Sequence, residues 1–575
     1  MSGVGARFQA AGYKDPKPLI LVDGKPIIEH VVNLFPGETK FTFICNEEHL
    51  QTTAMREILQ RIAPLGSIAS IPPHKLGPVF ATLQMQDLID DQEEVIVNYC
   101  DFGTYWDYQD FLSHTRNRGA AGAIPSYRGF HPHMLGTTNY AFIKDSNQWL
   151  EAIKEKEPWT NNRLQEYASN GTYYFARGSY VKKYFEQAIK RNLSIPGATS
   201  ATSATSATGA NGEFYVSLVY NLMVEDKLPV SIYEIQHMLQ WGTPQDLREY
   251  EAWSGYFRQL VEKPSISQSV EQRSVNLIPL AGRGKRFADE GYTTPKPLIP
   301  VSGKPMIVQA AAALPRAEQQ IFVCLQDHLN TAPLKQALKQ AYPHASVIGI
   351  NAVTEGQACT CAIGLNNVDP EAPVTIGACD NSMLFDTKKY EALRDRADVD
   401  AIIWTFKNHP SAKTNPQMYG WVITDDQNKA IGVSVKKAIS STPEKDHAIV
   451  GAFYFKKAAH FTAGLESLYK NNIRINNEFY VDSLCGELIK LGLNVYVFEV
   501  DFYVCWGIPN DLRTFNYWQS FFHKCSWHPY SISKDHMVAA EAQQKLIEEA
   551  TTFAQSCDSF FTSQLSKKKV TELCK

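Results

Sequence analysis

Short apolar runs alternate with helical patterns along both halves of this 575-residue chain. In the second half, runs at 320–325, 346–350, 373–378 and 401–406 are typical of buried strands, and the period of Leu334–Ala341 predicts a helix. This alternation favours an α/β fold with mainly parallel, doubly wound sheets. In such a fold a ligand binds at the carboxyl ends of the strands.

The chain repeats itself, which predicts two tandem domains. The residues in four pairs are each separated by 279 positions: Arg7 and Arg286, Lys17 and Lys296, Gly77 and Gly356, Asp101 and Asp380. Later in each half the separation is 265, as between Glu213-Phe-Tyr-Val and Glu478-Phe-Tyr-Val. A register that holds over several motifs indicates a duplication.

The repeat also sets the expected domain boundaries. We expect a first domain at 1–261, a linker at 262–273, a second domain at 274–524 and a helical tail at 525–575, with Ser533 capping the last helix. Ala-Thr-Ser triplets at 197–210 predict a disordered insertion, because small polar residues cannot repay their ordering entropy. The first domain lacks an apolar strand before its glycine-rich loop, unlike the second.

A candidate phosphate loop follows the apolar run that starts at Leu277. It consists of Leu280, Ala281, Gly282, Gly284 and Arg286, with Pro295-Lys296-Pro297 a few residues later. Glycines remove side chains that would block a phosphate, and the arginine and lysine add positive charge. The first half offers Gly3, Gly5, Arg7 and Lys17 at the matched positions.

These motifs resemble the sugar nucleotidyltransferase superfamily, in tandem and over all but the tail. The resemblance implies two Rossmann-like domains of the GT-A type. It also implies a reaction that transfers a nucleoside monophosphate from a nucleoside triphosphate to a sugar 1-phosphate, releasing pyrophosphate. The products would be precursors of surface polysaccharides or glycoconjugates.

The resemblance also assigns site residues. Arg286 and Arg7 would hold the leaving pyrophosphate, and Lys296 and Lys17 would stabilise charge at the α-phosphate. Asp380 and Asp101 would bind Mg²⁺. The base would be read by Gly356 and Gln357, and by Gly77 in the first half. Matching Glu155-Lys156 to Lys436-Lys437 makes Lys156 and Lys437 the expected ligands of the sugar phosphate.

One family feature is missing from both halves. A second metal-binding aspartate usually precedes a Gly-Thr near the end of the domain, but Gln240 and Cys505 stand at that position. Asp501, Glu478 or Asp482 could replace it.

Composition narrows the alternatives. The formal net charge of −4 gives no electrostatic support for nucleic-acid binding. No stretch has the pattern of a signal peptide or a membrane span. The eleven cysteines lack the paired spacing of a zinc site or a disulfide scaffold, so we expect a cytoplasmic protein. A homo-oligomer is compatible with the sequence. The alternative hypotheses for its function are a cytidylyltransferase for a non-sugar phosphoalcohol, a glycosyltransferase, and a nucleotide-binding regulator whose sites have decayed.

Overall fold

The computed structural model describes residues 1–575 except 2, 4, 137, 196–211, 263–268 and 553–575. It divides into two compact units, Met1–Glu251 (unit 1) and Ala252–Thr551 (unit 2). The insertion expected at 197–210 and the end of the predicted tail lie outside the described residues.

No helix in the described part of the chain is both long enough and apolar enough to cross a membrane.

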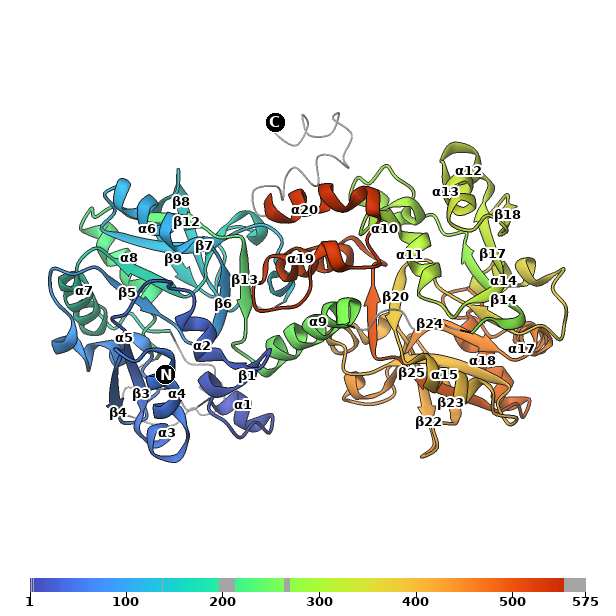
Figure 1. The fold of residues 1–575 in the computed structure, drawn as a ribbon, viewed down its shortest axis with the longest axis horizontal. Helices are drawn as coiled ribbons and strands as arrows, with labels where there is room; N and C mark the ends of the chain where they lie inside the picture. Colours follow the sequence, from blue (N-terminus) through green and yellow to red (C-terminus); the bar gives the residue numbers. More distant parts are fainter. Residues whose placement is uncertain (2, 4, 137, 196–211, 263–268, 553–575) are drawn as a thin grey trace. The chain divides into compact units, whose positions relative to one another are not determined.

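Unit 2 is built on a large twisted sheet (Figure 1). Its main path runs β18-β17-β14-β19-β24-β21-β25, and β22 and β23 extend it beside β24. These strands are β14 (Glu271–Leu280), β17 (Ala317–Leu325), β18 (Ser346–Ile350), β19 (Val374–Ile376), β21 (Ala401–Phe406), β22 (Gly420–Thr424), β23 (Ala430–Val435), β24 (His447–Phe455) and β25 (Val495–Glu499).

Two apolar cores pack against opposite faces of this sheet. Leu277 of β14 belongs to one core and Ile278 to the other, because successive side chains of a strand point to opposite faces. Helices α14 (Gln357–Leu365), α17 (Ala458–Lys470) and α18 (Val481–Lys490) cover the first face. Helices α11 (Met306–Ala312), α13 (Leu334–Ala341) and α15 (Thr387–Arg394) cover the second, which gives three layers.

The predicted strands and the helix at Leu334–Ala341 are confirmed, but the sheet is mixed. The pairs of β14 with β17 and β19, β17 with β18, and β21 with β25 are parallel. Strand β24 runs antiparallel to β19, β21 and β22. The parallel half, β18-β17-β14-β19, is the part that carries the glycine-rich loop.

Unit 1 repeats this design with one difference at its centre. Strand β14 joins β17 to β19 in unit 2, but no described strand of unit 1 joins β3 (Thr42–Asn46) to β5 (Val95–Asn98). Strand β3 therefore forms a separate parallel pair with β4 (Ser67–Ile71). Strand β5 ends the other sheet, whose order is β10-β8-β9-β12-β7-β11-β5.

The remaining strands of that sheet are β7 (Gly122–Tyr127), β8 (Ala141–Ser146), β9 (Trp149–Glu155), β10 (Tyr167–Ser169), β11 (Thr172–Phe175) and β12 (Val230–Glu234). Helices α5 (Pro78–Leu83), α7 (Gly178–Lys190) and α8 (Val216–Glu225) cover one face, and α6 (Tyr108–Asn117) packs on the other. Smaller elements are α1 (Ala6–Ala10), β1 (Leu21–Val22), β2 (Lys25–Pro26), α2 (Ile27–Val32), α3 (Glu47–Thr52), α4 (Met55–Ile62), β6 (Phe102–Tyr105) and β13 (His237–Gln240).

Helix α9 (Pro244–Glu262) contains the division between the units. The corresponding small elements of unit 2 are α10 (Lys285–Asp289), β15 (Pro300–Val301), β16 (Lys304–Pro305), α12 (Gln326–Thr331), β20 (Asn381–Leu384), α16 (Pro410–Thr414), β26 (Phe502–Cys505) and α19 (Pro509–Lys524).

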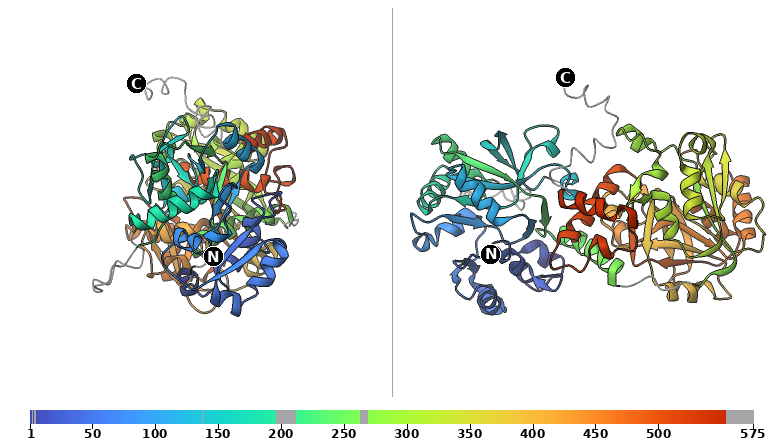
Figure 2. Two further views of the ribbon diagram at one scale, coloured as in Figure 1. Left: turned by 90° about the vertical axis from the view of Figure 1, so that its left-hand side faces the viewer. Right: turned by 45° about the horizontal axis from the view of Figure 1, so that its top comes forward.

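The described part of the tail packs on unit 2. Helix α20 (Gln543–Thr552) lies beside α19, where the Ser520 hydroxyl donates to the Ala550 carbonyl over 3.0 Å (Figure 2). The predicted helix start at Ser533 is wrong, because Ser533 lies in a short 3₁₀ turn and α20 begins ten residues later. Residues between them bind the β15–β16 hairpin through the Ala539 N–H and the Ser302 carbonyl, 3.0 Å apart.

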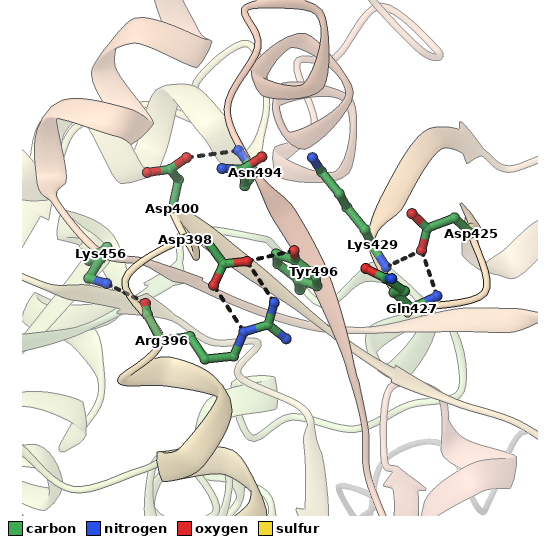
Figure 3. Close-up of polar contacts among 9 residues, drawn as sticks. All are labelled: Arg396, Asp398, Asp400, Asp425, Gln427, Lys429, Lys456, Asn494 and Tyr496. Carbon is green, nitrogen blue, oxygen red and sulfur yellow. Dashed lines mark hydrogen bonds and ion pairs between the residues drawn. The ribbon is translucent and has the colours of Figure 1, made fainter.

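A polar cluster occupies the amino-terminal ends of β21 and β25 (Figure 3). The Arg396 guanidinium donates to both carboxylate oxygens of Asp398 over 3.0 and 2.6 Å, and the Tyr496 hydroxyl donates to Asp398 over 2.9 Å. Asp400 accepts the backbone N–H of Asn494 over 2.8 Å. These groups satisfy one another, and in an α/β sheet a ligand binds at the opposite, carboxyl-terminal end of the strands.

Candidate functional site

A lysine–aspartate ion pair marks the carboxyl end of the parallel strands in unit 2. Lys296 Nζ lies 2.5 Å from Asp380 Oδ2, and it also donates to the Gly507 carbonyl over 3.0 Å. Both charged side chains are largely covered, with 16% and 27% of their surfaces exposed. The contact joins the segment after the glycine-rich loop, the end of β19 and the turn after β26.

Unit 1 contains the same ion pair. Lys17 Nζ lies 2.5 Å from Asp101 Oδ2, and the two side chains are 19% and 32% exposed. A side chain on Gly242 would stand 3.7 Å from that aspartate, just as one on Gly507 would stand 3.2 Å from Asp380 Oδ2. The structure thus brings together the four charged residues that the repeat matched, pair by pair.

Burial by itself would lower the pKa of Lys296, but the nearby Asp380 carboxylate outweighs it and raises that pKa. Lys296 therefore stays positively charged at neutral pH. A phosphate that entered this site would meet a cation already fixed in place.

Asp511 is a site residue that the sequence comparison did not find. Burial raises its pKa to about 6; Cys505 is its hydrogen-bond partner, and the charges of Asp380 and Lys296 act on it. It lies in the first turn of α19, where Asp246 of unit 1 is the matched residue at a separation of 265. Asp246 caps its helix by accepting from the Thr243 N–H and hydroxyl over 3.1 and 2.6 Å.

Asp511 still accepts the Ile508 backbone N–H, but it has no hydroxyl partner there because Ile508 stands where unit 1 has Thr243. The carboxyl beside Asp380 thus comes from Asp511, whereas we expected Asp501, Glu478 or Asp482. A sequence signal existed, since Asp246 and Asp511 match in both halves, but a capping aspartate gives the same signal.

The glycine-rich loop of unit 2 exposes a cluster of positive charge. Leu280 ends the buried strand β14 and the buried Ala281 follows it. Gly284 adopts φ +61° and lies against Lys296. A Cβ on Gly284 would stand 2.9 Å from that of Lys296. Arg283, Lys285 and Arg286 are exposed around this turn, and no ion pair in the described ranges includes any of them.

The matched loop of unit 1 keeps the turn but has less charge. Gly5 adopts φ +66°, and Gly3 and Arg7 are exposed. Val4 and Ala6 stand where unit 2 has Arg283 and Lys285, so Arg7 is the loop's single cation. The loop of unit 2 therefore carries more positive charge than the loop of unit 1.

Gly356 and Gly77 each have a packing role in the structure, and their expected part in binding the base stays a prediction. Gly356 has φ +136°, and a Cβ there would stand 2.5 Å from the backbone N and O of Phe479. Gly77 has φ +86° and is packed in the same way against Phe214. The Phe479 N–H also donates to the Glu355 carbonyl, and the Phe479 carbonyl accepts the Ala358 N–H. The side that each glycine opens is thus filled by this backbone, and Gln357 begins α14 behind it.

A cavity of about 510 Å³ opens beside this loop. Its lining consists of Thr354, Glu355, Cys359, Tyr469, Asn472, Arg474 and Phe479. None of the charged residues of the Lys296–Asp380 site lines it.

The structure matches Lys156 to Lys436. The expected match of Lys156 to Lys437 is therefore wrong by one residue. Lys156 and Lys436 both have φ +61°, and both follow the end of a strand, β9 or β23. Their N–H groups donate to the carbonyls of the matched Tyr140 and Tyr419 over 2.7 and 3.0 Å. Lys437 is exposed on the next position. The shared left-handed residue sets this register, which the sequence letters alone did not show.

Each of these lysines lies over a matched tyrosine. Lys156 Nζ is 4.9 Å from the Tyr215 ring centre and 3.0 Å from its hydroxyl, and Lys436 Nζ is 5.8 Å from the Tyr480 ring centre. The positive charge of Arg7 acts on Tyr215, so this lysine–tyrosine pair lies within electrostatic range of the glycine-rich loop of unit 1. The side chains expected to bind phosphate and acceptor therefore share one end of the sheet.

Family models match both halves of the chain. The family model described as "Nucleotidyl transferase" matches residues 1–213, and the one described as "MobA-like NTP transferase domain" matches residues 277–470. The chain therefore belongs to the nucleotidyltransferases and carries two such domains in tandem. A comparison with curated protein sequences finds no match.

Similar solved structures include three proteins. A nucleoside-diphosphate-sugar pyrophosphorylase from Vibrio cholerae RC9 is 20% identical, with 42% of this chain and 98% of that chain covered and a TM-score of 0.33. The inositol-1-phosphate CTP transferase from T. maritima is 13% identical, with 44% and 96% covered and a TM-score of 0.35. A putative glucose-1-phosphate thymidylyltransferase from Bacillus anthracis, in complex with a sucrose, is 15% identical, with 42% and 94% covered and a TM-score of 0.34.

The contact between Gly356 and Phe479 yields a stability prediction. Gly356→Ala places a Cβ 2.5 Å from backbone atoms at a strained φ, so the free energy of unfolding should fall by about 2–4 kcal/mol. Gly282→Ala is the matched control, because a Cβ there meets nothing within 4 Å, and it should change stability by less than about 0.5 kcal/mol. Urea denaturation measures both variants. Equal stabilities would show that the 354–357 loop is not fixed by Phe479.

Asp482, in the first turn of α18, yields a pH prediction. Burial raises its pKa to about 6, above the value of about 3.9 in an unfolded chain. The folded state thus binds this proton more tightly, so the group favours folding at low pH and loses that contribution as pH rises from about 4 to 6.

Asp482→Asn should therefore stabilise unit 2 at pH 8 by up to about 3 kcal/mol and have little effect at pH 4. Urea denaturation at both pH values tests this. A difference between variant and wild type that does not change with pH would contradict the burial of this carboxyl.

Proposed function

We propose that the chain transfers a nucleoside monophosphate from a nucleoside triphosphate to a sugar 1-phosphate, producing a nucleoside-diphosphate sugar and pyrophosphate. The observation that carries the proposal is the Lys296–Asp380 pair, set beside a loop that exposes three cations at the carboxyl end of parallel strands. Membership of the nucleotidyltransferases supports the reaction class. We place unit 2 as the main site of the reaction.

In this proposal the chain's own residues position charge. Arg283, Lys285 and Arg286 attract the β- and γ-phosphates, which leave as pyrophosphate. Lys296 stabilises the negative charge that develops around the α-phosphate. An oxygen of the acceptor phosphate forms the new bond to the α-phosphorus as the bond to the pyrophosphate oxygen breaks. Positioning and fixed charge account for most of the catalysis in transfers at phosphorus.

The residues present fit a bound Mg²⁺. The described residues contain no cluster of three or more His, Cys, Asp or Glu, so they offer no all-protein metal cage. Mg²⁺ usually takes only one or two carboxylates and completes its shell with phosphate oxygens and water. Asp380, with Asp511 beside it, supplies that number of carboxylates in unit 2, and Asp101 with Asp246 does so in unit 1. Mg²⁺ held there would neutralise charge on the triphosphate.

Unit 1 is the weaker catalytic candidate. Its loop has one cation where unit 2 has three, and no described strand joins β3 to β5. Its Lys17–Asp101 pair is nonetheless intact. We propose that unit 1 binds nucleotide with lower affinity, and that it contributes less to turnover.

Pyrophosphate release tests these assignments. The full chain is mixed with each nucleoside triphosphate, Mg²⁺ and a panel of hexose 1-phosphates. Lys296→Met should lower kcat/KM at least about 100-fold, because it removes a fixed charge at the reacting phosphate. The matched Lys17→Met should cost less than about threefold if unit 2 carries turnover.

Lys470→Met is the control, since that exposed lysine ends α17 and lies outside the site. Chelation of Mg²⁺ by EDTA should abolish release. Normal turnover in Lys296→Met would refute the role of the ion pair. A larger effect of Lys17→Met would transfer the reaction to unit 1.

A further inference from the structure

The acceptor side of the two units differs by three linked substitutions. In unit 1, Ala141 of β8 pairs with Glu155, the last residue of β9. The Ser217 hydroxyl, in the first turn of α8, donates to the Glu155 carboxylate. The carboxylate beside Lys156 thus comes from a strand, and the helix supplies its hydroxyl partner.

Unit 2 reverses the arrangement. Gly420 of β22 pairs with Val435, which stands where unit 1 has Glu155. Asp482, at the start of α18, stands where unit 1 has Ser217. A Cβ on Gly420 would lie 2.2 Å from Asp482 Oδ2, so the carboxylate occupies the space that the Ala141 methyl group takes in unit 1. The carboxylate therefore comes from a helix in unit 2, whereas it comes from a strand in unit 1.

The Asp482 carboxylate has free hydrogen-bonding capacity. Glu155 receives the Ser217 hydroxyl, whereas Asp482 accepts its own backbone N–H, and within the described ranges no side chain donates a hydrogen bond to it. The charge of Lys436 acts on Asp482, and the Tyr480 ring lies near both. An ionised carboxylate accepts hydrogen bonds only, so a ligand here must offer a donor, and the hydroxyl groups of a carbohydrate are such donors.

The start of α18, where Asp482 lies, is tied to the loop that carries Gly356. Phe479, one residue before Tyr480, is hydrogen-bonded to Glu355 and Ala358 of the glycine loop that the sequence comparison assigned to the base. The start of α18 therefore cannot shift without moving that loop. An acceptor held at Asp482 and Lys436 would be fixed relative to the nucleotide.

We propose that Asp482 and Lys436 form the acceptor subsite of unit 2, in which Asp482 binds hydroxyl groups of a phosphorylated carbohydrate and Lys436 binds its phosphate. Gly420 is a positioning residue that makes room for the carboxylate. Because unit 1 supplies its carboxylate from Glu155 on the strand, the two units select acceptors with different hydroxyl arrangements. The inference rests on the proposed function, since it names the acceptor class of that same site.

Binding of acceptors by the full chain tests the proposal directly. Isothermal titration with hexose 1-phosphates and with choline phosphate is performed in the presence of Mg²⁺ and a non-hydrolysable triphosphate. Asp482→Ser should weaken hexose 1-phosphate binding at unit 2 at least tenfold, while triphosphate affinity changes less than twofold. Asp426→Ser, an exposed aspartate in the β22–β23 turn, is the matched control and should change neither.

A double-mutant cycle separates recognition from folding. Gly420→Ala should lower the melting temperature, because its Cβ meets Asp482, and Asp482→Ser in the same chain should restore it, as Ala141 and Ser217 coexist in unit 1. The restored double variant should still bind hexose 1-phosphate weakly. Adding Val435→Glu returns a carboxylate to the strand and should recover binding with the hydroxyl preference of unit 1.

Three results would overturn the inference. Unchanged hexose 1-phosphate affinity in Asp482→Ser would show that this carboxylate serves packing alone. Preferential binding of choline phosphate would exclude hydroxyl recognition, even if pyrophosphate is released and the reaction class holds. Stability that is not restored in the double variant would refute the link between Gly420 and Asp482. Conversely, hexose 1-phosphate binding that depends on Asp482 without any pyrophosphate release would preserve the subsite and contradict the proposed reaction.

Discussion

The ion pair between Lys296 and Asp380 holds together the three segments that build the end of the sheet. The lysine follows the glycine-rich loop, the aspartate follows β19, and the Gly507 carbonyl that accepts the same ammonium belongs to the turn after β26. Removing either charge would leave the other covered and uncompensated, which is costly inside a protein. The same pair in unit 1, at the same 2.5 Å, shows that the constraint was kept when the domain was duplicated.

Around this shared pair the two units differ by charge and by the origin of a carboxylate. Three exposed cations surround the loop of unit 2 and one surrounds that of unit 1. On the acceptor side, the exchange of Ala141, Glu155 and Ser217 for Gly420, Val435 and Asp482 keeps a carboxylate near a lysine but changes its direction of approach. Gly420 and Asp482 compensate one another sterically, which supports our proposal of altered specificity over decay of unit 2.

The sequence predicted those features that repeat at a constant spacing. Lys17, Lys296, Asp101 and Asp380 were located from their matched positions, although their pairing was not predicted, and several strands of unit 2 were located correctly. The matches of Arg7 with Arg286 and Gly5 with Gly284 likewise correspond to the same left-handed turn in both loops.

Features that depend on backbone conformation or on compensation were missed. Lys436 replaces Lys437 because a left-handed residue after the strand sets the register, and no letter pattern distinguishes two adjacent lysines. Asp482 lies on a different element from Glu155. A position-by-position comparison of the two halves therefore shows only that the glutamate is missing from unit 2. Asp511 was hidden by its resemblance to a capping residue, and the antiparallel β24 by apolar runs that are the same in either direction.

Isotope partition during turnover tests the central claim most directly. The full chain is given Mg²⁺, a hexose 1-phosphate and a nucleoside triphosphate labelled either at the α- or at the γ-phosphate. The account predicts that the α-label appears in a nucleotide–sugar conjugate and the γ-label in pyrophosphate, in amounts that depend on Lys296. Transfer of the γ-label to the acceptor, or its release as orthophosphate, would contradict nucleotidyl transfer at this site.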